Sequence, residues 1–405
     1  MLTLEILRAR HGDCLIVHYG ETDAPRMILI DGGPSKVWNV LKPRLEELRE
    51  ELLLDEDESL NLELMMVSHV DDDHINGILD LTREAVAQEN DGKPLLVTTK
   101  ELWHNSFNDI LNDDEIGAGA ASVQAMLAGL DDATALAHGL DDASRHDTLK
   151  ILASINQGRQ LRDDAKVLRW QVNSSAEDGL IMAHFEGNDR IALDGGLTFD
   201  IVGPMQAELT ELQEKHDKYL RDKELGVDVS ELEAAYADKS VPNLASIVAV
   251  LRCDGCSILL TGDARGDKVL EGLEQAGELP AGGTVRYDVL KLMHHGSDRN
   301  VTQGFFERVI ADHYVFCGDG HHGNPERATL EMLFAARPEG GFALHFSENV
   351  AKIDATRKKE RLEKEKPWDD ARDGLAALLA RPDATAAPVA VFEPGGANSL
   401  SLSLA

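Results

Sequence analysis

The stretch Leu64–Asp80, LMMVSHVDDDHINGILD, indicates a buried strand that gives way to a helix through a loop crowded with metal-binding side chains. Its first residues are apolar, and a helical pattern begins near Asn76-Gly77. Between them, His69–His74 carries two imidazoles and three carboxylates, a density that suits a divalent metal such as zinc or manganese. The end of a strand is also where an α/β sheet presents side chains rigidly. A solvated acidic loop with incidental histidines is disfavoured because distant parts of the chain repeat the pattern.

The whole chain has the size and composition of a globular protein. Its 405 residues can bury a large core, and 43% of them are hydrophobic. No apolar stretch approaches the roughly 18 residues that cross a bilayer, and four cysteines do not suggest a disulfide framework. The formal charge of −33 disfavours a broad nucleic-acid surface without excluding local contact. We expect a soluble, cytoplasmic protein that does not associate with a membrane.

Strands and helices alternate along the chain, so we predict a mixed α/β fold in one domain over residues 1–405. Two helical insertions interrupt it, at about 107–169 and 205–239, and a helical extension covers about 350–380. Helices are predicted at Val37–Leu54, Ile75–Ala87, Asp267–Gln275, Asp354–Lys364 and Asp369–Leu379. The predicted strands include Leu2–Leu7, Cys14–His18, Met27–Asp31, Leu62–Ser68, Pro94–Leu102, Leu197–Val202, Ser246–Arg252, Ser257–Leu260, Tyr287–Met293, His313–Cys317, Gly341–Phe346 and a final one around Val389–Glu393.

Three distant segments share one feature, in which a hydrophobic strand ends and a metal-binding side chain follows. Asp263 comes after Thr261-Gly262, and His294-His295 comes after the strand Tyr287–Met293. An open catalytic metal site needs ligands from several elements and a free position for water, which the metal helps to deprotonate. The sequence therefore predicts a hydrolytic metal centre. Its candidate ligands are His69, Asp71, Asp73, His74, Asp263, His294 and His295.

Several motifs together give the chain a resemblance to a known family. His69–His74 has the form H-x-D-x-D-H, and five further segments occur in the family's order: Gly12-Asp13, Ile30–Gly33, Asn243–Val248, Leu259–Asp263 and Leu290–Ser297. With these motifs the chain resembles metallo-β-lactamase-fold hydrolases, most closely the hydrolase domain of the DNA-uptake protein ComEC and its soluble relatives. The resemblance implies an α/β (α+β) fold, namely a four-layer αββα sandwich with helical insertions and with metals at one edge of two facing sheets.

The resemblance also implies a role for each ligand. His69 and Asp71 would face one metal position, and Asp73 and His74 the other. Asp263 would bridge the two, and either His294 or His295 would complete the second position. Asp31 would orient a ligand imidazole through its other ring nitrogen. Asp73 would also be the catalytic residue that orients the attacking water and accepts its proton.

Two departures from the superfamily pattern bear on the metal. Gly203-Pro204 stands where many members carry a ligand histidine, and Asp71 replaces another histidine. Oxygen ligands favour harder ions such as Mn²⁺ or Mg²⁺. We therefore expect one or two divalent ions, with Zn²⁺ first by superfamily habit and Mn²⁺ second.

Five other polar residues near strand ends have more open roles. His104 could contact metal or substrate, or bond only to backbone. His321 and His322, in a Gly-rich loop, favour substrate contact or support of the ligands. Ser297 follows the histidine pair, but no nucleophile elbow surrounds it. His11 is expected to serve the Gly12-Asp13 turn.

We predict a metal-dependent hydrolase that uses metal-activated water on a phosphodiester. The resemblance to a presumed nuclease domain favours a nucleic acid or nucleotide, and the acidic surface favours a small or single-stranded one. A first alternative is hydrolysis of a lactone, thioester or amide. A second is an interaction module with a vestigial metal site, whose acidic helical insertions dock a protein partner.

Overall fold

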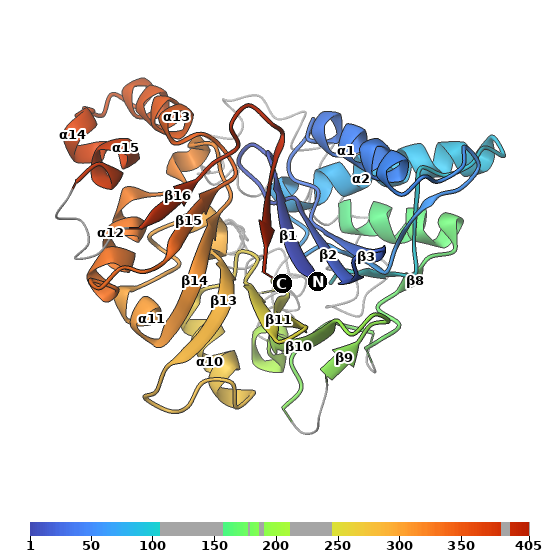
Figure 1. Ribbon diagram of the computed structural model, residues 1–405, viewed down its shortest axis with the longest axis horizontal. Coiled ribbons are helices and arrows are strands. Elements are labelled where there is room, and N and C mark those ends of the chain that lie inside the picture. Colours follow the sequence, from blue (N-terminus) through green and yellow to red (C-terminus); the bar gives the residue numbers. More distant parts are fainter. Residues whose placement is uncertain (106–156, 177–178, 186–189, 211–244, 382–388, 405) are drawn as a thin grey trace, which may run out of the picture.

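The computed structural model describes residues 1–105, 157–176, 179–185, 190–210, 245–381 and 389–404. They form a mixed α/β protein with two large mixed sheets and helices on the outer side of each (Figure 1). Most of the two predicted helical insertions, at about 107–169 and 205–239, lies outside the described residues. The described parts of them include a helix over 157–168 and a helical stretch over 206–210.

The first large sheet has the strand order β17-β1-β2-β3-β5-β7-β8. Its pairs are antiparallel from β17 to β3 and parallel from β3 to β8. Because β17 pairs with β1, the N- and C-terminal strands lie side by side (Figure 1). The strands are β1 (Leu2–Leu7), β2 (Leu15–Glu21), β3 (Ala24–Ile30), β5 (Leu64–Met66), β7 (Glu101–Trp103), β8 (Gln171–Val172) and β17 (Ser399–Ser403).

The second large sheet has the strand order β16-β15-β14-β13-β12-β11-β10-β9. It is antiparallel from β9 to β12 and parallel from β12 to β16. A third, two-stranded sheet pairs β4 (Leu60–Leu62) with β6 (Val97–Thr99). The strands of the second sheet are β9 (Arg190–Ala192), β10 (Thr198–Gly203), β11 (Val248–Cys253), β12 (Cys256–Leu260), β13 (Val285–Lys291), β14 (Val309–Phe316), β15 (Ala343–Phe346) and β16 (Ala390–Phe392).

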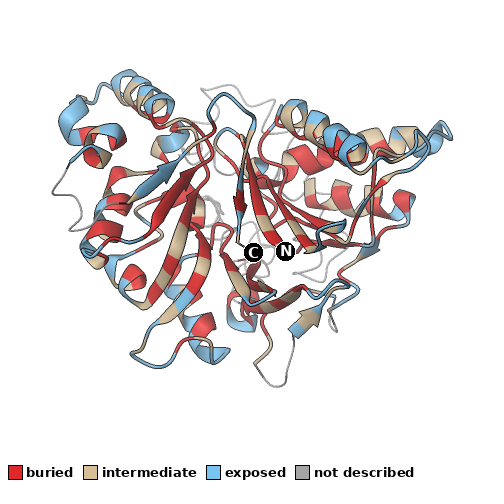
Figure 2. Cartoon of the chain, in the orientation of Figure 1, coloured by how far each residue is buried: buried red, intermediate tan, exposed pale blue. Residues whose placement is uncertain are grey.

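Alternating side chains of the strands build the apolar core between and behind the two sheets. In β5, Leu64 and Met66 join a cluster that also contains Ile258 and Leu260 of β12, so the two sheets pack face to face. Met65, between them, points to the opposite cluster beneath the helices. This is the period-2 pattern of a strand that is buried on both faces. Figure 2 shows the buried residues along the strands and on one side of the helices.

Helices cover the outer face of each sheet through apolar stripes. The first sheet packs against α1 (Trp38–Glu51) and α2 (Asp72–Asn90). The predicted extension at 350–380 holds α13 to α15, of which α13 and α15 pack in the second sheet's outer cluster, and β16 and β17 follow it. The helices on that side are α10 (Gly266–Gln275), α11 (Gln303–Arg308), α12 (Arg327–Ala336), α13 (Val350–Glu363), α14 (Asp370–Asp373) and α15 (Leu375–Leu379).

Two predicted strands are each broken at a charged residue. Leu62–Ser68 and Pro94–Leu102 are not continuous, because β4 ends before Glu63 and β6 ends before Lys100. Lys100 Nζ lies 2.6 Å from Glu63 Oε2, and Arg26 pairs with the other oxygen of the same carboxylate. These half-exposed ion pairs mark the point where the chain leaves the small sheet and enters the large one.

The structure also corrects three boundaries. Helix α2 begins at Asp72 and not near Ile75, so Asp73 and His74 lie in its first turn. Carboxylates are favoured there by the helix dipole. The region Asp369–Leu379 forms two short helices that are separated by Gly374. The strand around Val389–Glu393 is not the last, because Ser399–Ser403 forms β17 through its Ser-Leu alternation.

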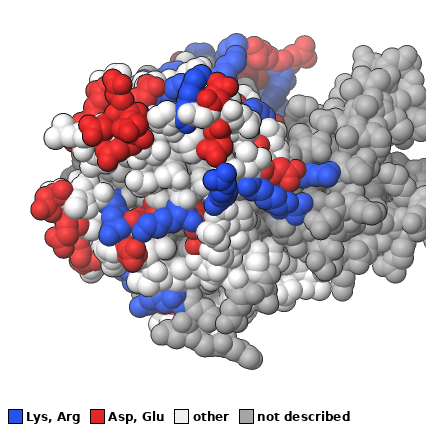
Figure 3. Space-filling view, turned by 90° about the vertical axis from the view of Figure 1, so that its right-hand side faces the viewer, with Lys and Arg blue, Asp and Glu red and all other residues white. Residues whose placement is uncertain are grey.

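The surface carries both signs of charge. Figure 3 shows Lys and Arg side chains among Asp and Glu on one face, so the net charge of −33 does not make that face uniformly acidic. Among the helices of the described ranges, none is both long and apolar enough for a membrane span.

Glu5 is predicted to make the protein's stability depend on pH. Its buried carboxylate in β1 pairs with Arg44 of α1 at 2.8 Å and with His18 at 2.9 Å. Burial raises its pKa, but these partners together lower it from 4.5 to about 2. A lowered pKa stabilises the fold above pH 4.5, and this stabilisation is lost as the pH falls towards 2. Urea unfolding should show Glu5→Gln less stable than wild type by on the order of 3 kcal/mol at neutral pH.

The difference in unfolding free energy between wild type and Glu5→Gln should shrink as the pH falls from 4.5 towards 2. The exposed Glu47, which pairs with the same Arg44, supplies the matched control as Glu47→Gln. A stability difference for Glu5→Gln that stays constant with pH would contradict this assignment.

Candidate metal centre

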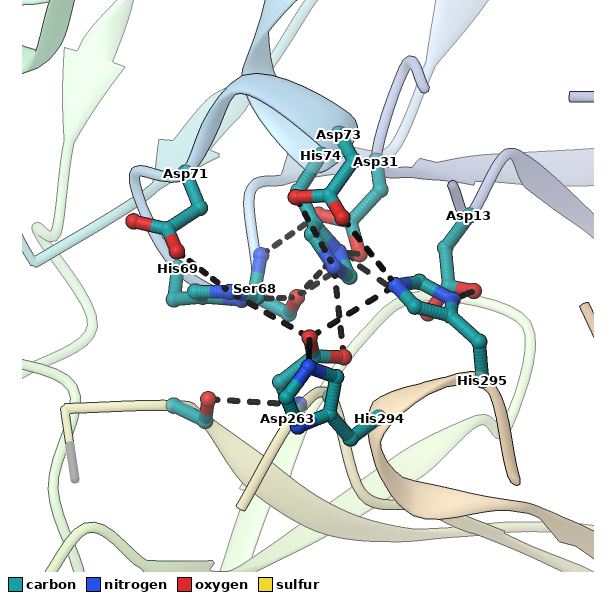
Figure 4. A network of polar contacts seen from close by, with 12 residues as sticks. Asp13, Asp31, Ser68, His69, Asp71, Asp73, His74, Asp263, His294 and His295 are labelled. Carbon is teal, nitrogen blue, oxygen red and sulfur yellow. Dashed lines mark hydrogen bonds and ion pairs between the residues drawn. The ribbon is translucent and has the colours of Figure 1, made fainter. Parts of the chain in front are cut away.

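The candidate site collects residues from five loops that follow strands of both sheets (Figure 4). Asp13 lies between β1 and β2, and Asp31 directly follows β3. The loop from β5 into α2 carries Ser68, His69, Asp71, Asp73 and His74. From the second sheet come Asp263, after β12, and the pair His294-His295, after β13. The two sheets therefore meet at this site.

A left-handed turn holds the histidine pair. His294, His295 and Gly296 have φ values of 47°, 55° and 84°, a conformation that costs a residue with a side chain about 1–3 kcal/mol. Neighbouring backbone fixes the turn, because the His294 amide donates to the Gly262 carbonyl at 3.2 Å. Thr329 Oγ1 and the Glu326 amide both donate to the Gly296 carbonyl, at 2.8 and 3.0 Å. This turn lets two consecutive imidazoles reach the same carboxylate.

Four imidazoles direct Nε2 at the carboxylate of Asp263. The Nε2 atom of His74 lies 3.3 Å from Oδ1, and that of His295 lies 3.5 Å from Oδ2. For His294 and His69 the distances to Oδ2 are 3.7 and 3.8 Å. The sequence left open which of His294 and His295 belongs to the site, and both reach Asp263.

Several of these atoms are buried without a hydrogen-bond partner. They are Nε2 of His69, His74 and His295, and Oδ1 of Asp263. A buried polar atom left unpaired costs about 1–3 kcal/mol, so four of them around one point need a physical reason. A cation between them would satisfy all four, and the donor set of imidazole nitrogens and a carboxylate is the one that such an ion prefers.

The other ring nitrogen of each imidazole is held in place. His74 Nδ1 lies 2.8 Å from Asp31 Oδ2, and His295 Nδ1 lies 3.1 Å from Asp13 Oδ1. Since a carboxylate only accepts, these Nδ1 atoms donate and leave Nε2 to face the site. His294 Nδ1 contacts Asn300 Oδ1 at 2.9 Å, and His69 Nδ1 contacts Ser68 Oγ at 3.3 Å. Asp31 thus contacts the Nδ1 atom of His74, and its orienting role stays a prediction.

The carboxylates set the electrostatics of the site. Burial lowers the pKa of His69 to about 3. Burial also acts on His295, yet Asp263 and Asp13 raise its pKa to about 9, and Asp263 and Asp31 raise that of His74 well above its usual value. The pKa of Asp263 is held well below normal, because His295 and His74 outweigh its burial. The carboxylates thus favour the protonated, positively charged forms of His74 and His295. A metal ion that binds at the Nε2 atoms would release these protons.

Two groups of residues could hold a metal ion, one fully buried and the other with the half-buried Asp73. One comprises Asp13, His74, Asp263 and His295, and the other His69, Asp73 and His74. In the first group, Asp13 contacts Nδ1 and not Nε2 of His295, so it supports the ring from behind. Asp73 Oδ2 lies 3.3 Å from His295 Nε2, whereas Asp71 Oδ2 lies 3.9 Å from His69 Nε2, at the outer end of the cluster (Figure 4).

Sequence reasoning missed three members of this site. Asp13 was noted only as part of a turn motif, and Lys291 and Asn300 were not identified. Lys291 is 1% exposed, pairs with Asp13, donates to the Gly262 carbonyl at 3.1 Å and lies 4.0 Å from Asp263 Oδ1. The sequence did contain a signal for Lys291, because it lies within the largely apolar strand Tyr287–Met293. A lysine is almost never buried in such a strand unless an opposite charge pairs with it.

The remaining candidates lie outside the Nε2 cluster. His104 is fully buried at the end of β7, where its backbone exchanges hydrogen bonds with the Asn173 side chain at 3.0 and 2.7 Å. Ser297 follows the histidine turn and donates its amide to the His294 carbonyl at 3.0 Å. His321 and His322 are exposed in the separate turn η2 (His321–Gly323).

Asp31→Asn is predicted to weaken metal binding without unfolding the protein. Asparagine tolerates the positive φ of 57° at this position and keeps the shape of the side chain. Its amide, however, can no longer fix His74 as a carboxylate does, and such supporting partners are worth about 10–100-fold in metal affinity. Competition with a chelator should measure that loss. An Asp31→Asn protein that binds metal as tightly as wild type would refute the orienting role.

No protein-family model and no curated protein sequence matches this chain. The chemistry of the site is therefore inferred from its own residues. Imidazole nitrogens and carboxylate oxygens that converge in a buried, strand-end site can hold a divalent ion.

Proposed function

We propose that the protein is a metal-dependent hydrolase of the metallo-β-lactamase type, related to the hydrolase domain of ComEC, and that it acts on a phosphodiester. The observation that carries the proposal is the convergence of four imidazole Nε2 atoms on Asp263 in a buried site, three of which, in His69, His74 and His295, are buried without a hydrogen-bond partner. Two sheets packed face to face, with helices outside and the site at the strand ends, support the αββα sandwich expected from the sequence motifs.

The residues fit one or two divalent ions. His74, His295, Asp263 and Asp73 would hold one ion, and His69, His294 and Asp71 would complete a second position around Asp263. A nitrogen-rich set favours Zn²⁺ first and Mn²⁺ second, because both His294 and His295 add imidazoles to a site expected to be richer in oxygen. A bound ion would activate water near neutral pH and neutralise charge that develops on the substrate.

Side chains of the protein direct the approach of the substrate, orient the attacking water and accept its proton. Side-chain exposure is 25% for Asp73, 26% for His294 and 32% for Asp71, but at most 3% for His74 and Asp263. Substrate therefore approaches from the side of Asp71, Asp73 and His294. Asp73 stands at that opening, where its carboxylate orients the attacking water and accepts its proton. Asp31 and Asp13 keep the rings of His74 and His295 in place behind it.

The phosphodiester assignment rests on the motif order and on the site's chemistry. A metal-lined site with a carboxylate base suits in-line hydrolysis of a phosphate ester, whose charge the ions offset. The chain carries a net charge of −33, which favours a small or single-stranded substrate.

A metal-supplemented substrate panel tests the proposal. Purified protein is analysed for bound metal by mass spectrometry and assayed with Zn²⁺ or Mn²⁺ on bis(p-nitrophenyl) phosphate, single-stranded DNA, RNA and a lactone. We expect bound metal and hydrolysis of the phosphodiesters. Hydrolysis of the lactone alone would show that the substrate is not a phosphodiester. A protein with neither metal nor activity would overturn the enzyme assignment.

A further inference from the structure

A second group of histidines lies beside the candidate metal centre. His11, in the turn between β1 and β2, meets His321 and His322 of η2, more than 300 residues away in sequence. The ring centroids are 5.0 Å apart for His11 and His321, 5.7 Å for His11 and His322, and 4.4 Å for His321 and His322. We call these three residues the rim cluster.

The rim cluster adjoins the open side of the metal centre. Next to His11, Gly12 packs so closely that a Cβ there would lie 1.9 Å from the Asp73 carbonyl oxygen, and the Asp13 amide donates to that oxygen at 3.2 Å. On the other side of the cluster, Asn324 Nδ2 donates to the His294 carbonyl at 3.2 Å. Asp73 and His294 are two of the residues through which the centre opens to solvent, so the cluster borders the path of the substrate.

The η2 turn is fixed on α13 and does not need substrate to order it. A Cβ at Gly320 would lie 2.2 Å from the Ile353 carbonyl oxygen, and Arg357 Nε donates to the Gly323 carbonyl at 3.1 Å. Glu360 Oε1 accepts from His321 Nδ1 at 2.7 Å. A rigid cluster loses little conformational entropy when it binds a ligand.

We infer that the rim cluster binds a phosphoryl group of the substrate that neighbours the reacting one. Ring N–H groups are donors suited to phosphate oxygens, the rings of His321 and His322 are exposed, and His11 Nδ1 is buried without a hydrogen-bond partner. The inference rests on the proposed function and narrows its substrate to a chain with at least two phosphoryl groups, such as a 5′-phosphorylated oligonucleotide. It also gives His11 a role beyond the turn.

Two dinucleotides that differ by one phosphate test the inference. Wild type and the double variant His321→Ala/His322→Ala are assayed on dithymidylate with and without a 5′-phosphate. We expect the double variant to lower the ratio of kcat/KM for the phosphorylated over the unphosphorylated dinucleotide about 10-fold, through KM, as loss of a charge-assisted hydrogen bond predicts. His313→Gln is the control, since that imidazole pairs with His345, 3.0 Å away, and not with the cluster.

Each other outcome has a distinct meaning. An unchanged ratio in the double variant would overturn the inference while the hydrolase assignment stands. Loss of bound metal in the double variant would also overturn it, because the cluster would then be a metal site. If wild type hydrolyses neither dinucleotide, the substrate panel decides the proposed function, and calorimetric titration with the phosphorylated dinucleotide decides the cluster: about 10-fold weaker binding to the variant supports it, and equal binding refutes it.

Discussion

Asp263→Asn is expected to abolish hydrolysis and metal binding together, with kcat/KM reduced at least about 1000-fold. Four imidazole Nε2 atoms lie 3.3–3.8 Å from this one carboxylate, so no other side chain in the described residues contacts so many candidate ligands. Asparagine keeps the shape but removes the negative charge that draws a cation to the rings. Metal content by mass spectrometry and initial rates on a phosphodiester measure the effect.

Asp267→Asn is the matched control for that experiment. Asp267 is exposed, lies four residues further along the chain and pairs with Arg265 at 2.7 Å, so both activity and metal content should match wild type. Asp263→Asn itself should stay folded, because the imidazoles of His74 and His295, whose pKa values Asp263 raises, can lose their protons and become neutral when that charge is removed. The assignment of Asp263 would be refuted by a folded variant that retains metal and turns over at the wild-type rate.

Lys291→Met should produce the largest loss of stability of any substitution considered, about 3–5 kcal/mol in urea unfolding. The side chains of Lys291 and Asp13 are 1% and 2% exposed, and they form a buried ion pair. Burial opposes the charge of Lys291, but Asp13 and Asp263 keep its pKa above the ordinary value, so it stays charged when folded. Methionine fills the space yet leaves the Asp13 carboxylate buried with only His295 and His74 to balance it.

A double-mutant cycle distinguishes this pairing from simple loss of packing. Adding Asp13→Asn to Lys291→Met removes the stranded charge, and we expect the double variant to recover at least half of the lost stability. Strictly additive losses would contradict direct coupling. Lys359→Met, at a side chain that is 76% exposed, should leave the unfolding free energy within about 0.5 kcal/mol of wild type.

Local sequence signals predicted much of the fold but not its interruptions. Apolar runs such as Ile247–Leu251, within the expected strand Ser246–Arg252, predicted buried strands, because period and composition act over neighbouring residues. The breaks at Glu63 and Lys100 coincide with an ion pair between segments 37 residues apart, and no local pattern contains such a contact. The strand Ser399–Ser403 was missed for the same reason: its pairing with β1 is a tertiary contact, and a Ser-Leu alternation is weak evidence alone.

The candidate site, like the fold, was predicted only in part from local sequence signals. The sequence identified five residues because they follow strands, namely His69, His74, Asp263, His294 and His295. The structure brings the four imidazoles around the carboxylate of Asp263. Asp13, Lys291 and Asn300 were missed because they act on other side chains, and such roles are visible only once the chain is folded. Asp71, which stands where the superfamily pattern has a histidine, is 32% exposed and lies at the outer end of the site, 3.9 Å from His69 Nε2.

The left-handed turn at His294-His295-Gly296 has an evolutionary consequence. Positive φ values favour glycine or asparagine, so selection for thermal robustness alone would replace both histidines. Keeping them there costs backbone stability but lets two adjacent rings reach a shared carboxylate. Attempts to make this protein more heat-resistant by relaxing strained backbone would therefore remove candidate metal ligands at this turn, while the same strategy at Leu53 or Lys36 would not touch the site.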